Sequence, residues 1–264
     1  MKYDFDRQGN GLPVILIHGF CENRTMWDEL GPLLASNYDV IAIDLPGFGE
    51  ARDNEVLHIR ENADHVIGLM DELDVEKALI AGHSMGGYVG LSILQHHSDR
   101  IYGLSLFNSH AASDSEEKAQ NRLKSIDFIR QHGTDEFFKL FVRDLLSKKN
   151  DQRADWIEEL LAMVSVTPQS SVIASMYRMM ERLDQLELVR STEMPLQIMI
   201  GTEDKMYNAD TVLGQFALAQ NIDIRLFPSG HLGIKEMPDE YHRAFKEFID
   251  FAVLYSERLS SAFF

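Results

Sequence analysis

A serine between two glycines is the strongest chemical signal in the sequence. Residues 82–87 read Gly-His-Ser-Met-Gly-Gly, which places Ser84 in a G-x-S-x-G pattern. Apolar residues occupy 78–81 before the pattern and most of 89–94 after it, so we expect the serine on a tight turn between a strand and a helix. A Cβ at either flanking glycine would crowd such a turn. The pattern therefore predicts a nucleophilic hydroxyl at the positive end of a helix dipole.

A serine hydroxyl is a poor nucleophile until a base takes its proton. His231 follows the apolar run 222–227 after a short loop, and Asp204 follows the run 196–201 in the same way. Because sites of open parallel sheets lie at the carboxyl ends of strands, we expect both side chains near Ser84. The predicted chemistry is acyl transfer, with Ser84 as nucleophile, His231 as general base and Asp204 as the acid that orients the imidazole.

Short apolar runs alternate with helical patterns along most of the chain. Strands are expected at 14–18, 40–44, 78–82, 104–108, 196–201 and 222–227, and helices at 25–36, 54–73, 85–97, 209–219 and 239–254. Continuous apolar runs are typical of parallel strands buried on both faces. Their alternation with helices predicts an α/β fold, with a mostly parallel central sheet and helices on both of its faces.

One long segment interrupts this alternation. From 109 to 193 there is no convincing strand, and helical patterns open instead at Thr134 and at Thr167-Pro168. The predicted organisation is therefore an α/β core made of residues 1–108 and 194–264, with an all-helical cap, or lid, at 109–193 inserted into it.

Composition limits the partners that we expect. The chain has 264 residues and a formal net charge of −17, which argues against nucleic acid and mildly disfavours polyanionic substrates. Its single cysteine, Cys21, allows neither an intramolecular disulfide nor a multi-cysteine metal site. No apolar run is long enough for a signal core or a membrane span. We expect a cytoplasmic protein with no metal, no cofactor, no nucleic acid partner and no membrane span.

Further motifs resemble those of the α/β-hydrolase superfamily, in the same order along the chain. Besides 82–87, they are His18-Gly19-Phe20, the D-x-P-G-x-G turn at 44–49, Gly201-Thr202-Glu203-Asp204, and Ser229-Gly230-His231. The resemblance runs from about residue 12 to 250. It implies the α/β-hydrolase fold and a serine esterase, and the family's G-x-x-D spacing favours Asp204 over Glu203 as the acid.

A tetrahedral oxyanion needs two donors. The backbone N–H of Met85, directly after the nucleophile, is one expected donor, and the resemblance implies the backbone N–H of Phe20 as the other. The candidate lining of the substrate pocket is Phe20, Met85, Phe138, Phe141, Met206 and Leu232. Apolar residues of the predicted cap suggest a small ester-like substrate with an uncharged or apolar acyl group.

Other functions on the same fold stay open. A carboxylesterase is favoured, but thioesters, lactones and carbon–carbon bonds β to a carbonyl are alternative targets. The synthase of the menaquinone pathway is similar in its H-G-F and D-L-P-G motifs, but it carries arginine where this chain has Tyr88. A non-catalytic ligand receptor is less favoured because all three triad positions are filled.

Overall fold

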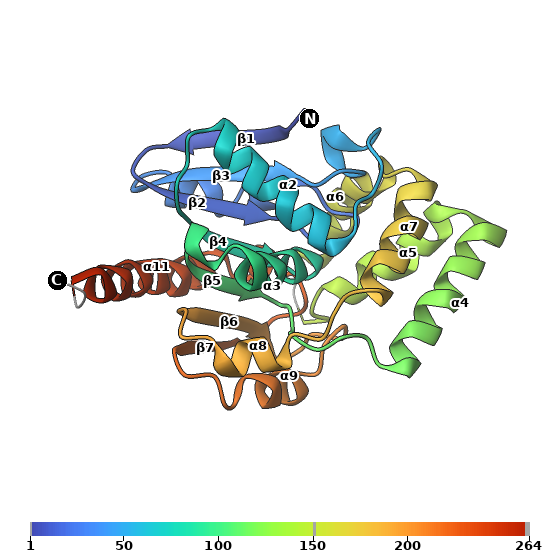
Figure 1. Cartoon of the computed structure of the whole chain (residues 1–264). Helices are drawn as coiled ribbons and strands as arrows, with labels where there is room; N and C mark the ends of the chain where they lie inside the picture. Colours follow the sequence, from blue (N-terminus) through green and yellow to red (C-terminus); the bar gives the residue numbers. More distant parts are fainter. Residues whose placement is uncertain (1, 150–151, 262–264) are drawn as a thin grey trace.

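The computed structural model describes residues 2–149 and 152–261 and contains one seven-stranded sheet (Figure 1). The strands are β1 (Asp4–Gly9), β2 (Leu12–Ile17), β3 (Tyr38–Asp44), β4 (Ala78–His83), β5 (Ile101–Phe107), β6 (Leu196–Gly201) and β7 (Ile222–Phe227). Their order in the sheet is β1-β3-β2-β4-β5-β6-β7, and only the pair β1–β3 is antiparallel. The predicted mostly parallel sheet is confirmed.

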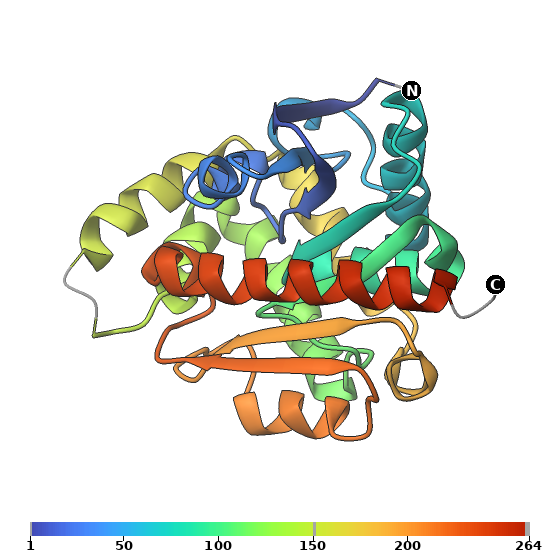
Figure 2. The same cartoon turned by 90° about the vertical axis from the view of Figure 1, so that its left-hand side faces the viewer.

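Helices cover both faces of the sheet. Two helices, α2 (Ile59–Glu72) and α3 (Met85–His96), pack together on one face, and the long helix α11 (Pro238–Ser261) lies along the other (Figures 1 and 2). The shorter helices of the core are η1 (Arg24–Trp27), α1 (Gly31–Leu34), η2 (Gly49–Ala51), η3 (Ser98–Arg100), α9 (Ala209–Phe216) and α10 (Gly233–Glu236). Strands β3 and β4 are buried along their whole length, which explains their continuous apolar sequence.

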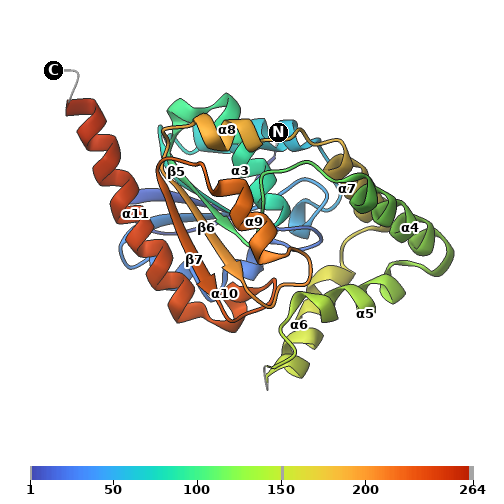
Figure 3. The same cartoon turned by 90° about the horizontal axis from the view of Figure 1, so that it is seen from below.

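Only helices occur between β5 and β6 in the described residues. They are α4 (Glu116–His132), α5 (Thr134–Leu145), α6 (Arg153–Ser165), α7 (Gln169–Met180) and α8 (Leu186–Ser191). Helices α4 to α7 lie together beyond the carboxyl ends of the parallel strands (Figures 1 and 3). The starts of α5 and α7 agree with the predicted helix openings at Thr134 and Thr167-Pro168.

No single helix of the described residues is long and apolar enough to cross a membrane. Helices α6 and α7 pass the length and composition limits only as a pair, and a 95° bend separates them.

The turn after β4 has the tight geometry that the glycines predict. Ser84 has φ 50° and ψ −113°, in the left-handed half of the map that costs a non-glycine residue energy. A Cβ on Gly82 would collide with the backbone of Gly86, and a Cβ on Gly86 would collide with the carbonyl oxygens of Ile17 and His18. Because these neighbours are backbone atoms, they cannot rotate away.

We therefore expect Gly86→Ala to lower the free energy of unfolding by about 1–3 kcal/mol through overpacking. Urea denaturation followed by circular dichroism measures the change. Gly214→Ala is the matched control, because Gly214 lies in helix α9 with nothing near its missing Cβ and alanine should raise stability there by about 0.5–1 kcal/mol. Equal effects of the two substitutions would contradict the close approach at the turn.

Candidate active site

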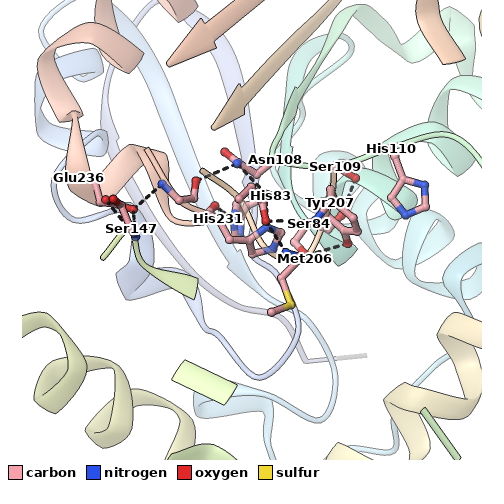
Figure 4. A network of polar contacts seen from close by, with 12 residues as sticks. His83, Ser84, Asn108, Ser109, His110, Ser147, Met206, Tyr207, His231 and Glu236 are labelled. Carbon is pink, nitrogen blue, oxygen red and sulfur yellow. Dashed lines mark hydrogen bonds and ion pairs between the residues drawn. The ribbon is translucent and has the colours of Figure 1, made fainter. Parts of the chain in front are cut away.

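The predicted triad residues follow three strands at the same edge of the sheet, and the structure pairs His231 directly with Asp204. Ser84 follows β4, Asp204 lies in the loop after β6, and His231 lies in the loop after β7. His231 Nδ1 lies 2.7 Å from Asp204 Oδ2. Tyr207 links this pair to the serine, because its hydroxyl lies 3.4 Å from Ser84 Oγ and its ring lies 5.1 Å from the His231 ring (Figure 4).

Asp204 is held as a buried hydrogen-bond acceptor. Besides His231, its carboxylate accepts from Asn108 Nδ2 at 3.0 Å and from the backbone N–H groups of Met206 and Tyr207 at 2.7 and 3.2 Å. Burial alone would raise the pKa of Asp204, but the charge of His231 and these hydrogen bonds outweigh it and lower that pKa below its ordinary value. An ionised Asp204 can accept the Nδ1 proton of His231, which leaves Nε2 free to act as a base.

Glu203, the neighbouring carboxylate, pairs elsewhere. Its side chain accepts from Ser147 Oγ at 2.5 Å and from Lys149 Nζ at 2.6 Å. Its partly exposed side chain contacts residues after α5, whereas the side chain of Asp204 is fully buried beside His231. The geometry therefore offers His231 one carboxylate partner, Asp204.

Asn108 at the end of β5 fixes the acid and the histidine loop together. Its Nδ2 donates both to Asp204 and, at 3.1 Å, to the backbone carbonyl of Gly230, while its Oδ1 accepts from the Tyr241 hydroxyl at 2.9 Å (Figure 4). Asn108, Gly230 and Tyr241 are buried, and so is the side chain of Asp204. Asn108 therefore holds the Asp204 side chain and the His231 loop in fixed positions.

The two segments expected to stabilise an oxyanion lie side by side. Strands β2 and β4 are parallel neighbours, with Ile17 opposite Gly82. The start of α3 therefore packs directly against the loop that contains Phe20. Met85 is the first residue of α3, so its backbone N–H has no acceptor within the helix. This places one expected donor next to the nucleophile and the loop of the other against the same turn.

The structure contains a buried ion pair under this loop that the sequence analysis did not predict. Glu22 accepts from the backbone N–H of Gly19 at 2.6 Å and contacts His83 Nδ1 at 2.8 Å, and His83 Nε2 lies 3.0 Å from the carbonyl oxygen of His231. Both ring nitrogens of His83 thus face acceptors, so the geometry requires a protonated imidazole that donates twice. The Glu22–His83 pair ties the Phe20 loop to the His231 loop.

The pKa of each partner shifts in the direction that favours its charged form. Burial lowers the pKa of His83, but the charge and hydrogen bond of Glu22 outweigh it, and the net shift is upward. Burial likewise raises the pKa of Glu22, but the charge and hydrogen bond of His83 outweigh it, and the net shift is downward. The stabilisation by Glu22 is lost as pH falls through its lowered pKa. The stabilisation by His83 is lost as pH rises through its raised pKa.

We expect Glu22→Gln to lower the free energy of unfolding by about 3 kcal/mol, because it leaves a buried imidazolium without its counter-charge. The loss of stability should be largest at pH values between 4.5 and 6.5, the ordinary pKa values of the two groups, because both are then charged in the folded protein. Urea denaturation at a series of pH values measures it. Glu55→Gln, at an exposed carboxylate, is the control. A loss that does not vary with pH would contradict the ion pair.

The candidate pocket residues are spread over several parts of the structure. Phe20 meets Phe141 of α5 edge to face, with ring centroids 5.6 Å apart, and Met206 lies between Asp204 and Tyr207 in the acid loop. Phe138 and Met85 are almost completely buried. Leu232 lines a separate cavity of about 340 Å³ with Glu22 and Lys235.

Another cavity, of about 480 Å³, lies beside Tyr88. It is lined by Tyr88, His110 and Arg182 among others. The Tyr88 hydroxyl lies 2.7 Å from the Tyr207 hydroxyl and so connects this cavity to Ser84 by hydrogen bonds. Tyr207 lies three residues after Asp204, and its contact with Ser84 is a further feature that the sequence motifs did not reveal.

Known proteins are similar to this chain in sequence and in fold. A family model described as "alpha/beta hydrolase fold" matches residues 13–238. The acetyltransferase component of an acetoin cleaving system from Pseudomonas putida is 42% identical over 100 residues, which cover 38% of this chain and only 27% of that protein. The 2-hydroxy-6-oxo-6-(2'-aminophenyl)hexa-2,4-dienoic acid hydrolase of Metapseudomonas resinovorans is 26% identical over 250 residues, which cover 91% of this chain and 85% of that protein.

Among solved structures, a thermophilic esterase from Thermogutta terrifontis, described with malate bound, superimposes with a TM-score of 0.87. It is 28% identical, and the match covers 95% of this chain and 93% of the esterase. Since the family model matches residues 13–238, which are most of the sequence, the chain belongs to the α/β-hydrolase family.

Proposed function

We propose that the chain is a serine esterase that hydrolyses a carboxylic ester through an acyl-serine intermediate. The observation that carries the proposal is the hydrogen bond between His231 Nδ1 and Asp204 Oδ2, in a site where Tyr207 connects His231 to the hydroxyl of Ser84. This set of groups has the composition and order of a catalytic triad.

In the proposed reaction, His231 Nε2 takes the proton of Ser84 as Oγ attacks the ester carbonyl. The backbone N–H groups of Phe20 and Met85 then donate to the oxyanion. The C–O bond of the ester breaks as His231 returns the proton to the departing alcohol. Water, activated by His231 in the same way, attacks the acyl-serine and releases the acid and free Ser84.

The substrate is proposed to bind between the core and the helices that follow β5. Residues 109–193 would act as a lid over the core formed by 1–108 and 194–264. The contact between Phe20 and Phe141 supports this arrangement, since it joins the oxyanion loop to α5 by an apolar surface. An apolar surface at this position favours an aliphatic acyl chain. The esterase name of the Thermogutta relative supports ester cleavage.

A hydrolysis screen tests the proposed function. Nitrophenyl esters of graded acyl length are compared with lactones, thioesters and β-diketones at equal enzyme concentration. We expect the esters to have the highest kcat/KM, with an optimum at a short or medium chain. Turnover of lactones, thioesters or diketones without turnover of esters would assign a different reaction to the site. A folded protein that is inert toward all four classes would contradict the proposed hydrolase function.

A further inference from the structure

Three basic side chains lie near the active site with a single carboxylate, which pairs with two of them. Lys118 and Arg122 lie on α4, and Arg182 lies just after α7. Asp114 pairs with Arg122 Nε at 2.6 Å and with Arg182 Nη1 at 2.7 Å. Within residues 2–149 and 152–261, Lys118 has no ion pair with a carboxylate. These four residues, here called the Lys118 cluster, carry a local excess of positive charge in a chain whose net charge is −17.

The ammonium of Lys118 lies over a side chain that contacts the nucleophile. Lys118 Nζ lies 4.3 Å from the centroid of the Tyr207 ring, and the hydroxyl of that ring lies 3.4 Å from Ser84 Oγ. A single tyrosine side chain therefore separates the ammonium from the nucleophile.

His110 adds a hydrogen-bond donor beside the cluster. Its Nε2 lies 3.1 Å from the Tyr88 hydroxyl and 3.4 Å from both Lys118 Nζ and Arg182 Nη2. Because lysine and arginine only donate, Nε2 must accept, and the proton of the neutral ring lies on Nδ1. That atom is buried and has no partner in the described part of the chain, and His110 lines the cavity of about 480 Å³.

The surroundings leave the positive charge uncompensated. Burial, together with Lys118 and Arg182, lowers the pKa of His110 to about 2, so its ring stays neutral at physiological pH. Burial also lowers the pKa of Lys118, because a partly desolvated ammonium without a counter-ion is unfavourable. An anion bound at this position would supply the missing counter-charge.

We propose that the Lys118 cluster is an anion subsite and that the substrate is an ester whose acyl chain ends in a carboxylate. The carboxylate pairs with Lys118 Nζ, and the aliphatic part of the chain lies along the Tyr207 ring. This inference rests on the proposed function of Ser84 and narrows its substrate class. It replaces the uncharged or apolar acyl group expected from the apolar residues of the predicted cap, since the charge beside the site is positive although the whole chain is acidic.

Monomethyl adipate and dimethyl adipate form a matched pair of substrates, because they differ in one carboxylate. We expect the wild-type protein to have a higher kcat/KM for the monoester. In Lys118→Met the monoester-to-diester ratio of kcat/KM should fall about tenfold or more, which is the size of one lost charge-assisted hydrogen bond. Lys118→Arg should keep most of the ratio. Lys124→Met, at an exposed lysine of the same helix, should not change it.

An unchanged ratio in Lys118→Met would overturn the anion subsite. Circular dichroism establishes that each variant is folded, and Lys118→Gln, which removes the charge but stays polar, takes the place of Lys118→Met if the methionine variant unfolds. An equal fall of kcat/KM for both esters would also overturn the subsite, because a purely structural role does not depend on the charge of the substrate.

Calorimetric binding to Ser84→Ala separates the subsite from the proposed function, since this variant cannot form an acyl-serine. We expect monomethyl adipate to bind at least about tenfold more tightly than dimethyl adipate, and this preference to be lost when Lys118→Met is added. Equal affinities, or no binding of either ester, would overturn the subsite. Charge-selective binding without turnover of either ester by the wild-type protein would instead contradict the esterase and leave the subsite supported.

Discussion

Ser84→Ala is expected to lower kcat for ester hydrolysis by about 10⁴- to 10⁶-fold, the range of such losses in enzymes that use a serine triad. The reason is that no other group at the end of β4 can form the acyl intermediate. KM should change little, because the hydroxyl contributes to the reaction rather than to binding. Initial rates with the best nitrophenyl ester measure both constants.

The control for this prediction is Ser36→Ala, at an exposed serine after α1, which should keep the wild-type rate. The unfolding midpoint of Ser84→Ala should stay close to that of the wild-type protein, because alanine has the same Cβ and therefore the same strain at φ 50°. A loss of less than about 100-fold in kcat of a folded Ser84→Ala protein would show that ester hydrolysis by this protein does not need the Ser84 hydroxyl.

Asp204→Asn is expected to lower kcat by about 10⁴-fold, as the corresponding change does in a serine protease triad. The amide is neutral, so it cannot stabilise the imidazolium that forms when His231 takes the serine proton. It can also donate to His231 Nδ1 and so favour the tautomer whose Nε2 already carries a proton. Steady-state kinetics at neutral pH, where the lowered pKa of Asp204 keeps the wild-type acid ionised, measure the effect.

Glu203→Gln provides a matched control one residue away. It removes a carboxylate from the same loop, but this carboxylate contacts Ser147 and Lys149 rather than His231. We expect kcat to stay within a few-fold of the wild-type value. A larger loss in Glu203→Gln than in Asp204→Asn would transfer the orienting role to Glu203 and contradict the geometry of the site.

The sheet is well predicted where the sequence is continuously apolar. The runs at 196–201 and 222–227 coincide with β6 and β7. The strand expected at 104–108 instead begins at Ile101, because Tyr102 and Gly103 interrupt the apolar run without ending the strand. These differences concern the ends of elements, where hydrogen bonding to a neighbouring strand outweighs local preference.

Helices are predicted less well where short breaks divide them. The helix expected at 25–36 is two separate helices, η1 (Arg24–Trp27) and α1 (Gly31–Leu34). Pro32 explains the second start, since proline favours the first turn of a helix. The helix expected at 54–73 begins only at Ile59, where His58 and Glu61 form a capping box.

The residues of the proposed triad could be singled out from the sequence because each follows a recognisable strand. The groups around them could not, because their contacts join distant parts of the chain. Glu22 and His83 are 61 positions apart, and Ser84 and Tyr207 are 123 apart. Lys118 is one of many charged residues on α4, and its sequence position does not set it apart. Only the packing of α4 beside the loop that carries Tyr207 shows that it lies near the site.

Labelling with a fluorophosphonate tests the central claim most directly, because the reagent reacts with an activated serine and needs no knowledge of the substrate. Mass spectrometry should find one adduct per chain, on the peptide that contains Ser84. His231→Ala should slow the labelling by at least about 100-fold, since the hydroxyl then has no general base. No adduct at Ser84 in the folded protein, or equally fast labelling of His231→Ala, would contradict the proposed serine hydrolase mechanism.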